Sequence, residues 1–268
     1  MSITYHLDHQ TFSTIGSPID LAIPLDFYGP QPILYGVAAA NGQAYQADGF
    51  IGDVRRGGGL NFETYQLTPH CNGTHTECVG HLTQERLYVH EVLKESFWLS
   101  QLITIESILA SQTQDQYDPP LQDADRVIDR SQLIQAWPLK SKSKALIIRT
   151  HPNPSEKRYW DYSQVQPPFF TLEAMQEIRA RGVQNLLVDF PSVDRLFDEG
   201  KLRNHRTFWG LAPGQKALRD KEVPTQTITE MVYVPEGVID GTYLLELQIA
   251  PFLADAAPSR PRIFELRS

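Results

Sequence analysis

Alternating or clustered apolar residues at several places along the chain predict β-strands. Asn61–Leu67 alternates polar and apolar residues after a glycine triplet, whereas Lys144–Thr150 and Gln184–Asp189 are short apolar runs typical of buried strands. The other segments with a strand pattern are Ile19–Leu25, Thr227–Val234, Tyr243–Ile249 and Arg262–Leu266.

Three further segments predict helices. The segment from Thr171 to Gly182 has an N-cap residue at its start, an apolar face and a glycine at its end. Asp129–Trp137 begins at a second possible N-cap and is followed by a proline, and Glu85–Glu95 is the third segment. Interspersed strands and helices favour a mixed α/β class, or an α+β class, with a mostly mixed sheet. Prolines and glycines are spread throughout, so we expect a single domain over residues 1–268.

Composition narrows the possible functions. The 24 Lys and Arg residues are outnumbered by 32 Asp and Glu residues, giving a net charge of −8, and no basic tract is present. This charge argues against nucleic-acid binding. Two cysteines are too few for a disulfide framework, the N-terminus lacks the pattern of a signal peptide, and no apolar run could span a bilayer. We therefore expect a soluble cytoplasmic protein with a small-molecule substrate and no membrane partner.

The segment from residue 70 to residue 81, HCNGTHTECVGH, holds three of the eight histidines and both cysteines. Its imidazole, thiol and carboxylate groups are those that bind borderline metals. In an extended chain, Cys71, His75, Glu77 and His81 would share one face, with His75 and Glu77 about 6.6 Å apart. Cys71 could join them only if the chain bends, and Gly73 would allow the bend.

Other interpretations of this segment stay open at this point. A single histidine or buried cysteine is more often structural than functional, and a thiol site is a further alternative. The clustering favours a metal site. Because no CxxC pair is present, we expect an open catalytic site completed by distant residues and solvent rather than a closed structural zinc site.

The segment resembles a motif of the cyclase family of metal-dependent hydrolases, which includes kynurenine formamidase and isatin hydrolase. The family pattern H-x-G-T-H-x-D-x-P-x-H is matched at Gly73, Thr74, His75 and His81. A second family signature, D-x-x-S-x-D-R, is matched over Asp189–Arg195. A histidine and then a glutamate follow that signature in the family, and His205 and Glu230 are their counterparts here. The resemblance covers about residues 18–266.

The resemblance implies a swivelling β/β/α fold and a homodimer. It also implies one or two zinc ions, or manganese as in other members. Carried over position by position, the implied ligands are Cys71, His75, Glu77, His81, His205 and Glu230. Three positions depart from the pattern: Cys71 replaces histidine beside His70, Glu77 replaces aspartate, and Val79 replaces proline. A thiolate at position 71 would favour zinc over manganese.

The implied activity is that of an arylformamidase of tryptophan catabolism, in which a metal-activated water attacks a formamide or cyclic amide carbonyl. The proton must then be moved by His81, His205 or Glu230, and the sequence leaves all three open. Two alternatives remain: a lactam or lactone hydrolase or a cyclase on another ring, and a non-catalytic metal- or thiol-dependent binding protein. Arg55 and Arg56 could bind a substrate carboxylate or lie on a solvated loop. The motif residues Asp189, Ser192 and Asp194 could contact the metal ligands or fix a turn, and we expect them to be structural.

Overall fold

The computed structural model describes residues 3–7, 10–138, 141–218 and 223–267. Ten of the described strands form one mixed sheet, in the order β1-β2-β17-β15-β8-β11-β13-β14-β7-β16. The strands β8, β11, β13 and β14 are parallel to their neighbours in this group, and the remaining pairs in the sheet are antiparallel. The strands of the sheet are β1 (Thr4–Leu7), β2 (Gln10–Asp20), β7 (His75–Glu77), β8 (Phe97–Glu106), β11 (Ala145–His151), β13 (Asn185–Val188), β14 (Thr227–Glu230), β15 (Gly241–Glu246), β16 (Ala256–Pro258) and β17 (Arg262–Arg267).

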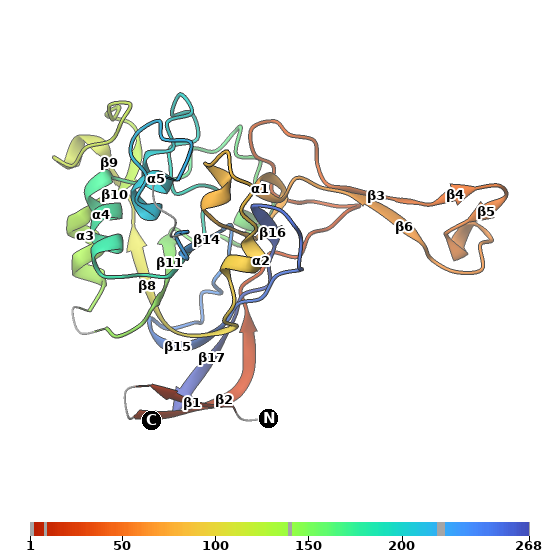
Figure 1. The fold of residues 1–268 in the computed structure, drawn as a ribbon, viewed down its shortest axis with the longest axis horizontal. Helices are drawn as coiled ribbons and strands as arrows, with labels where there is room; N and C mark the ends of the chain where they lie inside the picture. The colour runs from red at the N-terminus through yellow and green to blue at the C-terminus, as the bar shows by residue number, and fades with distance from the viewer. Residues whose placement is uncertain (1–2, 8–9, 139–140, 219–222, 268) are drawn as a thin grey trace.

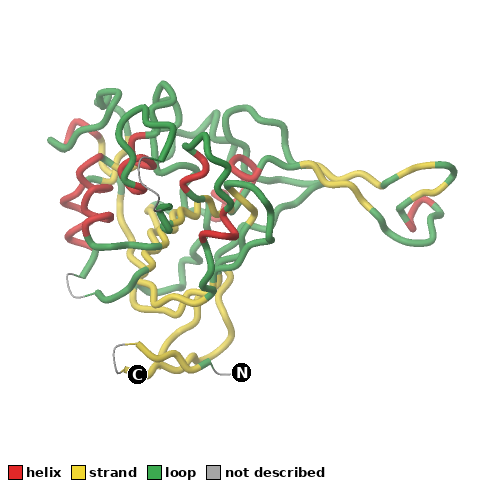
Figure 2. Tube along the Cα trace, viewed as in Figure 1, coloured by secondary structure: helices red, strands yellow, loops and turns green. Residues whose placement is uncertain are grey.

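Helices cover one face of this sheet. Figures 1 and 2 show α3, α4 and α5 together on one side of the molecule. Smaller elements fill the connections. The helices are α1 (Pro69–Asn72), α2 (Val89–Val92), α3 (Arg130–Ala136), α4 (Leu172–Ala180) and α5 (Arg203–Trp209), the single-turn elements are η1 (Val54–Arg56), η2 (Val79–His81), η3 (Ala110–Gln112) and η4 (Ser155–Tyr159), and a small sheet contains β9 (Ile108–Leu109), β10 (Arg126–Ile128) and β12 (Phe169–Phe170).

The core lies on both faces of the central strands. Along β11, Leu146 and Ile148 pack with residues of the helices, whereas Ala145 and Ile147 pack with residues of β15 and β17 on the other face. This alternation follows from the two-residue period of a strand. Because both faces are covered, the central strands are apolar throughout, as their sequence pattern predicted.

The mixed α/β class is confirmed, and most predicted elements are present. The helix after Thr171 is α4, whose cap side chain accepts a hydrogen bond from the backbone N–H of Ala174. The helix after Asp129 is α3, capped in the same way. The predicted strands at 61–67, 144–150, 184–189 and 262–266 correspond to β6 (Glu63–Gln66), β11, β13 and β17.

Other predicted boundaries were wrong. The strand expected over Ile19–Leu25 is β2, which ends at Asp20, whose carboxylate accepts a hydrogen bond from the N–H of Ala22. The predicted strands at 227–234 and 243–249 end at residues 230 and 246 as β14 and β15. Only α2 forms within Glu85–Glu95. The N–H of Val89 donates to the carbonyl of Ala254, so the backbone at the start of α2 is bonded to a distant segment and not to a preceding helical turn.

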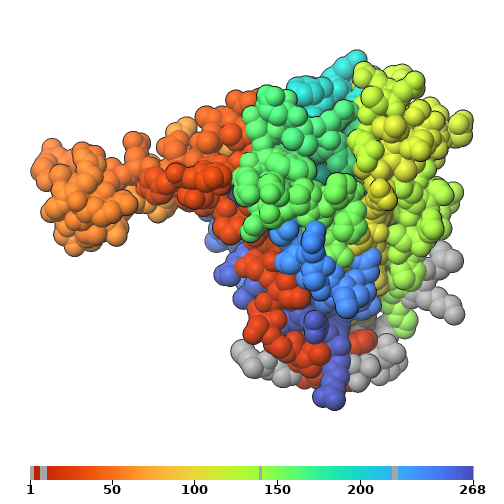
Figure 3. Space-filling model, turned by 180° about the vertical axis from the view of Figure 1, so that it is seen from behind, coloured from red at the N-terminus to blue at the C-terminus, as the bar shows by residue number. Residues whose placement is uncertain are grey.

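A narrow arm projects from the body between residues 41 and 66. Its strands β3 (Asn41–Ala44) and β6 pair with each other, and β4 (Gln46–Ala47) pairs with β5 (Phe50–Ile51) beyond them. Figures 1 and 3 show from opposite sides that the arm stands clear of the body. Three partly exposed rings, those of Tyr45, Phe50 and Phe62, lie 5.2–6.3 Å apart near its end. Within the described residues, no helix has the length and apolar character needed to cross a membrane.

Candidate metal centre

The short strand β7 brings predicted ligands from separate parts of the chain together. His75 and Glu77 are two residues apart on this strand, so their side chains point to the same face. The strand register places Glu230 of β14 opposite His75. On the other edge, β16 begins opposite Glu77. All three side chains are buried, so the centre lies inside the protein rather than on a loop.

A buried group of possible metal ligands consists of Glu77, His205 and Glu230. One ligand atom from each lies within 4.8 Å of the others. The Nε2 atom of His205, from α5, is 2.8 Å from Oε1 of Glu77 and 3.5 Å from Oε1 of Glu230. The Nε2 atom of His75 lies 3.5 Å from the other oxygen of Glu230. Two imidazole nitrogens and two carboxylates therefore face one another in the buried interior.

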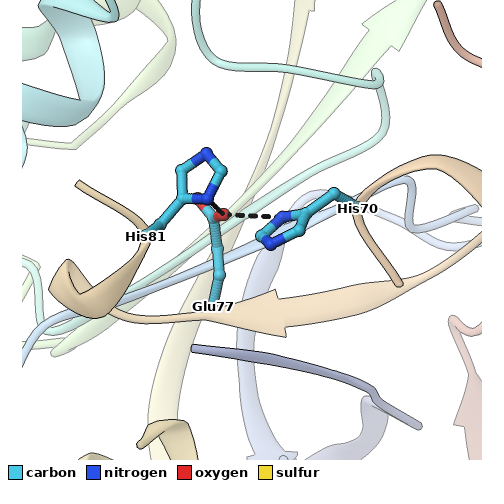
Figure 4. Close-up of side chains that lie close together, drawn as sticks. All are labelled: His70, Glu77 and His81. Atoms are coloured by element: carbon cyan, nitrogen blue, oxygen red, sulfur yellow. Dashed lines mark ion pairs between the residues drawn. The ribbon is translucent and has the colours of Figure 1, made fainter. Parts of the chain in front are cut away.

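A second group, partly exposed, shares Glu77 with the first. It consists of His70, Glu77 and His81, and its ligand atoms also lie within 4.8 Å of one another. The Nδ1 atoms of His70 and His81 are 3.1 Å and 3.9 Å from Oε2 of Glu77. Figure 4 shows the two rings on either side of this carboxylate. Glu77 thus directs one oxygen toward each group.

Each of the two buried imidazoles has a hydrogen-bond partner at its Nδ1 atom. The Nδ1 atom of His75 lies 3.0 Å from the carbonyl of Gly73, and that of His205 lies 2.6 Å from Oδ2 of Asp194. With the ring hydrogen on Nδ1, each ring donates to its acceptor and leaves the Nε2 lone pair free. This arrangement is common for metal-binding histidines, whose second nitrogen is fixed by a carbonyl or carboxylate.

Unpaired polar atoms test whether the centre suits a metal ion. Among the described residues, neither Nε2 of His75 and His205 nor either carboxylate oxygen of Glu77 has a hydrogen-bond partner, although all are buried. The close approach of Glu77 and His205 lacks hydrogen-bond alignment. Leaving buried polar groups unpaired costs about 1–3 kcal/mol each, and more for charged groups. A cation bound between them would satisfy these atoms, and nitrogen and oxygen ligands suit zinc or manganese.

Burial and neighbouring charges shift the pKa values of the buried carboxylates apart in the metal-free protein. Burial, reinforced by the charge of Glu77, raises the pKa of Glu230 to about 8. Burial acts in the same direction on Glu77, but His81, His205 and His70 overcome it and hold the pKa of Glu77 well below its usual value. Glu77 is therefore the ionised carboxylate at neutral pH, with a negative charge aimed at both groups.

The pKa values of the histidines are shifted too. Burial, together with the charge of His70, lowers the pKa of His75 to about 3. Burial also opposes the charge on His70, but the hydrogen bond to Asp255 and the nearby carboxylate of Glu77 prevail and raise the pKa of His70 to about 10. The pKa of His205 is likewise raised, because Glu77 and Asp194 outweigh its burial. His75 is thus ready to bind a cation, whereas His70 and His205 must first lose a proton.

Five of the six predicted ligands meet at this centre. His75, Glu77, His81, His205 and Glu230 all face it, as described above. The sixth, Cys71, belongs to neither group. Its side chain packs in an apolar cluster with Leu34 and Tyr162, and burial raises its thiol pKa.

The position of His70 has a local physical reason. The prediction of a shared face assumed an extended chain from residue 71 to residue 81, but Pro69–Asn72 forms the helical turn α1. Successive side chains on a helix point about 100° apart, so two-residue alternation does not apply. The turn directs His70 toward Glu77, and Cys71 points into the apolar cluster.

Two further carboxylates contact the histidines, and sequence reasoning missed the second of them. Asp194, expected to be structural, contacts the ring of His205. Asp255 was not singled out at all, yet its Oδ2 atom lies 2.9 Å from Nε2 of His70 and 3.3 Å from Nδ1 of His81. Asp194 belongs to the second motif and was among the residues considered, whereas no sequence pattern marks Asp255.

The two arginines considered for substrate binding lie elsewhere. Arg55 and Arg56 form part of η1 on the projecting arm. The guanidinium of Arg55 is paired with the carboxylate of Asp53 at 2.9 Å. The described structure therefore gives Arg55 a local structural partner rather than a place at the centre.

Comparisons with known proteins agree with this architecture. Residues 3–195 match the family model described as "Putative cyclase". Isatin hydrolase A from Labrenzia aggregata is 15% identical and superposes over 92% of this chain and 93% of its own, with a TM-score of 0.62. A predicted metal-dependent hydrolase from Bacillus stearothermophilus is 13% identical over 92% of this chain and 98% of its own, with a TM-score of 0.59. At these identities the structural matches show a common fold. No curated protein matched the chain.

Proposed function

Since the chain belongs to the cyclase family, we propose that it is a metal-dependent hydrolase that cleaves the carbon–nitrogen bond of an amide, with an aryl formamide as its substrate. One observation carries the proposal: buried, unpaired nitrogens of His75 and His205 face the carboxylates of Glu77 and Glu230. A purely structural core would leave few such atoms unsatisfied. The likeness to isatin hydrolases supports the same chemistry.

The buried group would hold the catalytic ion, with Glu77, His205 and Glu230 as ligands and His75 beside them. When bound, a divalent ion such as zinc supplies a water of lowered pKa and a Lewis acid for the carbonyl oxygen. The protein's own residues fix this arrangement. Asp194 orients His205, and the N–H of Val193 donates to Oε1 of Glu230 at 2.8 Å.

Among the three residues considered for proton transfer, His81 is the best suited. Both ring nitrogens of His205 face carboxylates, and Glu230 lies between two buried histidines. The side chain of His81 is 26% exposed, and one of its ring nitrogens points away from Glu77 in Figure 4. Because this nitrogen is not the one that faces Glu77, it is free to deliver a proton to the leaving amine even when the partly exposed group holds an ion.

A cyclic amide is the second candidate substrate. The structural neighbours include isatin hydrolases, so opening of a lactam ring uses a fold of this kind. The chemistry at the carbonyl would be the same, and the pocket would decide between the two substrates. Formamide and lactam substrates must therefore be compared directly.

Hydrolysis by metal-loaded protein tests the proposal. The chain would be stripped with a chelator, reloaded with zinc or manganese, and assayed with N-formylkynurenine, isatin and an aryl lactone. We expect metal-dependent release of formate from the formamide at the highest kcat/KM, and loss of turnover in Glu77→Gln. Failure to bind any transition metal, or equal hydrolysis by the stripped protein, would refute the proposal. Metal binding without hydrolysis of any substrate would indicate the non-catalytic alternative.

A further inference from the structure

Asp255 lies next to the partly exposed group because of strand pairing. It immediately precedes β16, whose first residue is opposite Glu77 on β7. The carbonyl of Asp255 accepts a hydrogen bond from the N–H of Cys78 at 3.0 Å. This bond extends the ladder by one residue and fixes the backbone of Asp255. Its side chain is therefore presented to the histidines from a strand edge rather than from a loose loop.

The carboxylate of Asp255 contacts two histidines at once. Its Oδ2 atom accepts from Nε2 of His70 at 2.9 Å and lies 3.3 Å from Nδ1 of His81. Held in this way, the ring of His70 turns its other nitrogen, Nδ1, to within 3.1 Å of Glu77. The two imidazole rings are 4.3 Å apart between centroids. Asp255 thus sets the spacing of the group and the direction of His70.

The same arrangement occurs in the buried group. There, Asp194 holds Nδ1 of His205 and leaves Nε2 facing Glu77. In the partly exposed group, Asp255 holds Nε2 of His70 and leaves Nδ1 facing Glu77. The two carboxylates use opposite ring nitrogens, but each leaves a nitrogen directed at the shared glutamate. Removing a carboxylate that holds a metal-binding histidine in this way commonly lowers metal affinity by about 10–100-fold.

The charge of the group also suits a cation. Two carboxylates, those of Glu77 and Asp255, surround two imidazoles, so the protein provides two negative charges and nitrogen lone pairs once the rings are deprotonated. Metal binding releases such protons. In addition, Cys71 is withdrawn into an apolar cluster and provides no ligand here. The group consequently depends on His70, and His70 depends on Asp255 for its orientation.

We propose that Asp255 is a positioning residue that orients His70 so that the partly exposed group binds a second metal ion. The inference rests on the proposed function, because Glu77 would be shared by both ions. It goes further by assigning a role to Asp255, and by placing His70 where the sequence pattern pointed to Cys71.

Stoichiometry and affinity of metal binding test this proposal without measuring activity. Full-length stripped protein would be titrated with zinc against a chromophoric chelator, and bound metal would be counted after equilibrium dialysis. We expect two ions per chain in the unaltered protein. In Asp255→Ala, the weaker ion should bind about 10–100-fold less tightly while the tighter ion is unaffected. Asp255→Asn, which keeps an acceptor for His70, should be intermediate.

Asp20→Ala is the matched control. The Asp20 side chain is 38% exposed, compared with 37% for Asp255, and it also pairs with a basic residue, Arg260. This variant should bind both ions normally. The proposal is overturned if the unaltered protein binds a single ion, if Asp255→Ala binds both ions normally, or if it loses both. Absence of hydrolysis in protein that binds two ions would instead refute the proposed activity and leave the role of Asp255 standing.

Discussion

The Nε2 atom of His205 lies 2.8 Å from Oε1 of Glu77, which joins α5 to β7 at the centre of the protein. Neither atom has an aligned hydrogen-bond partner among the described residues. The other oxygen of Glu77 faces His70. One side chain therefore belongs to both groups of possible ligands, and its replacement should affect both.

Glu77→Gln should abolish binding of both ions. The amide keeps the size of the side chain but removes the negative charge from each group. We expect affinity for zinc to fall by more than about 100-fold, which exceeds the loss typical of removing a residue that contacts only a ligand and not the metal. Metal counted after dialysis checks this, with the exposed Glu91→Gln as control. Two ions bound at normal affinity in Glu77→Gln would contradict the shared role.

His70→Gln and Cys71→Ser distinguish the two candidates for one ligand position. His70 faces Glu77, whereas Cys71 lies in an apolar cluster. We expect His70→Gln to lose one ion and Cys71→Ser to retain both, with a stability loss of about 1 kcal/mol from burying a hydroxyl. Metal counting and thermal unfolding measure the two effects. The reverse pattern would show that the thiol, as the sequence pattern implied, is the ligand.

Much of the fold could be predicted because local signals agreed with the final packing. The strand β11 reads as an apolar run since both its faces are covered, and α4 carries a cap residue, an apolar face and a terminal glycine. The strand β2 could not be bounded in this way. An aspartate side chain at its end accepts a hydrogen bond from the N–H of the second residue after it, a local contact that the hydrophobic pattern does not encode.

The residues of the candidate site likewise include some that the sequence predicted and one that it could not. His75 and Glu77 were predicted from their alternation within one strand, and His205 and Glu230 from the resemblance to a family. Asp255 could not be predicted, because its contact with His70 depends on the pairing of β16 with β7. Long-range strand pairing sets which side chains meet, and short-range spacing carries no information about it.

We expect the aromatic cluster of the arm to contact a second copy of the chain in the predicted homodimer. An isolated two-stranded hairpin is only marginally stable in water. The side chains of Phe50 and Phe62 at the end of this hairpin are 40% and 53% exposed, so burying them against a partner would stabilise the arm. We expect Phe50→Ser with Phe62→Ser to shift the protein from dimer to monomer in light scattering. Phe252→Ser, which replaces a 47% exposed ring at another position, is the control. A monomeric unaltered protein would contradict this prediction.

The stability of the metal-free protein should fall as pH rises above about 6.5. The pKa of His70 is about 10 in the folded chain, compared with an ordinary value of 6.5, so its contribution to stability is complete below pH 6.5 and is lost as pH rises through 10. Glu230 acts in the same direction, because its pKa is raised from 4.5 to about 8 and its contribution is lost over that range. The losses of stability from His70 and Glu230 add between pH 6.5 and 8, and the loss from His70 continues to pH 10.

Thermal unfolding in the presence of a chelator at pH 6.5, 8 and 9.5 measures this dependence. We expect the Tm to fall by several degrees, at about 2–4 °C for each kcal/mol lost. Glu230→Gln should flatten the fall between pH 6.5 and 8, and His70→Gln should reduce it up to pH 9.5. Bound metal should counteract the fall, because deprotonated ligands bind the ion more tightly as pH rises. A metal-free protein whose Tm is constant or rises over this range would show that the two groups do not titrate as their surroundings indicate.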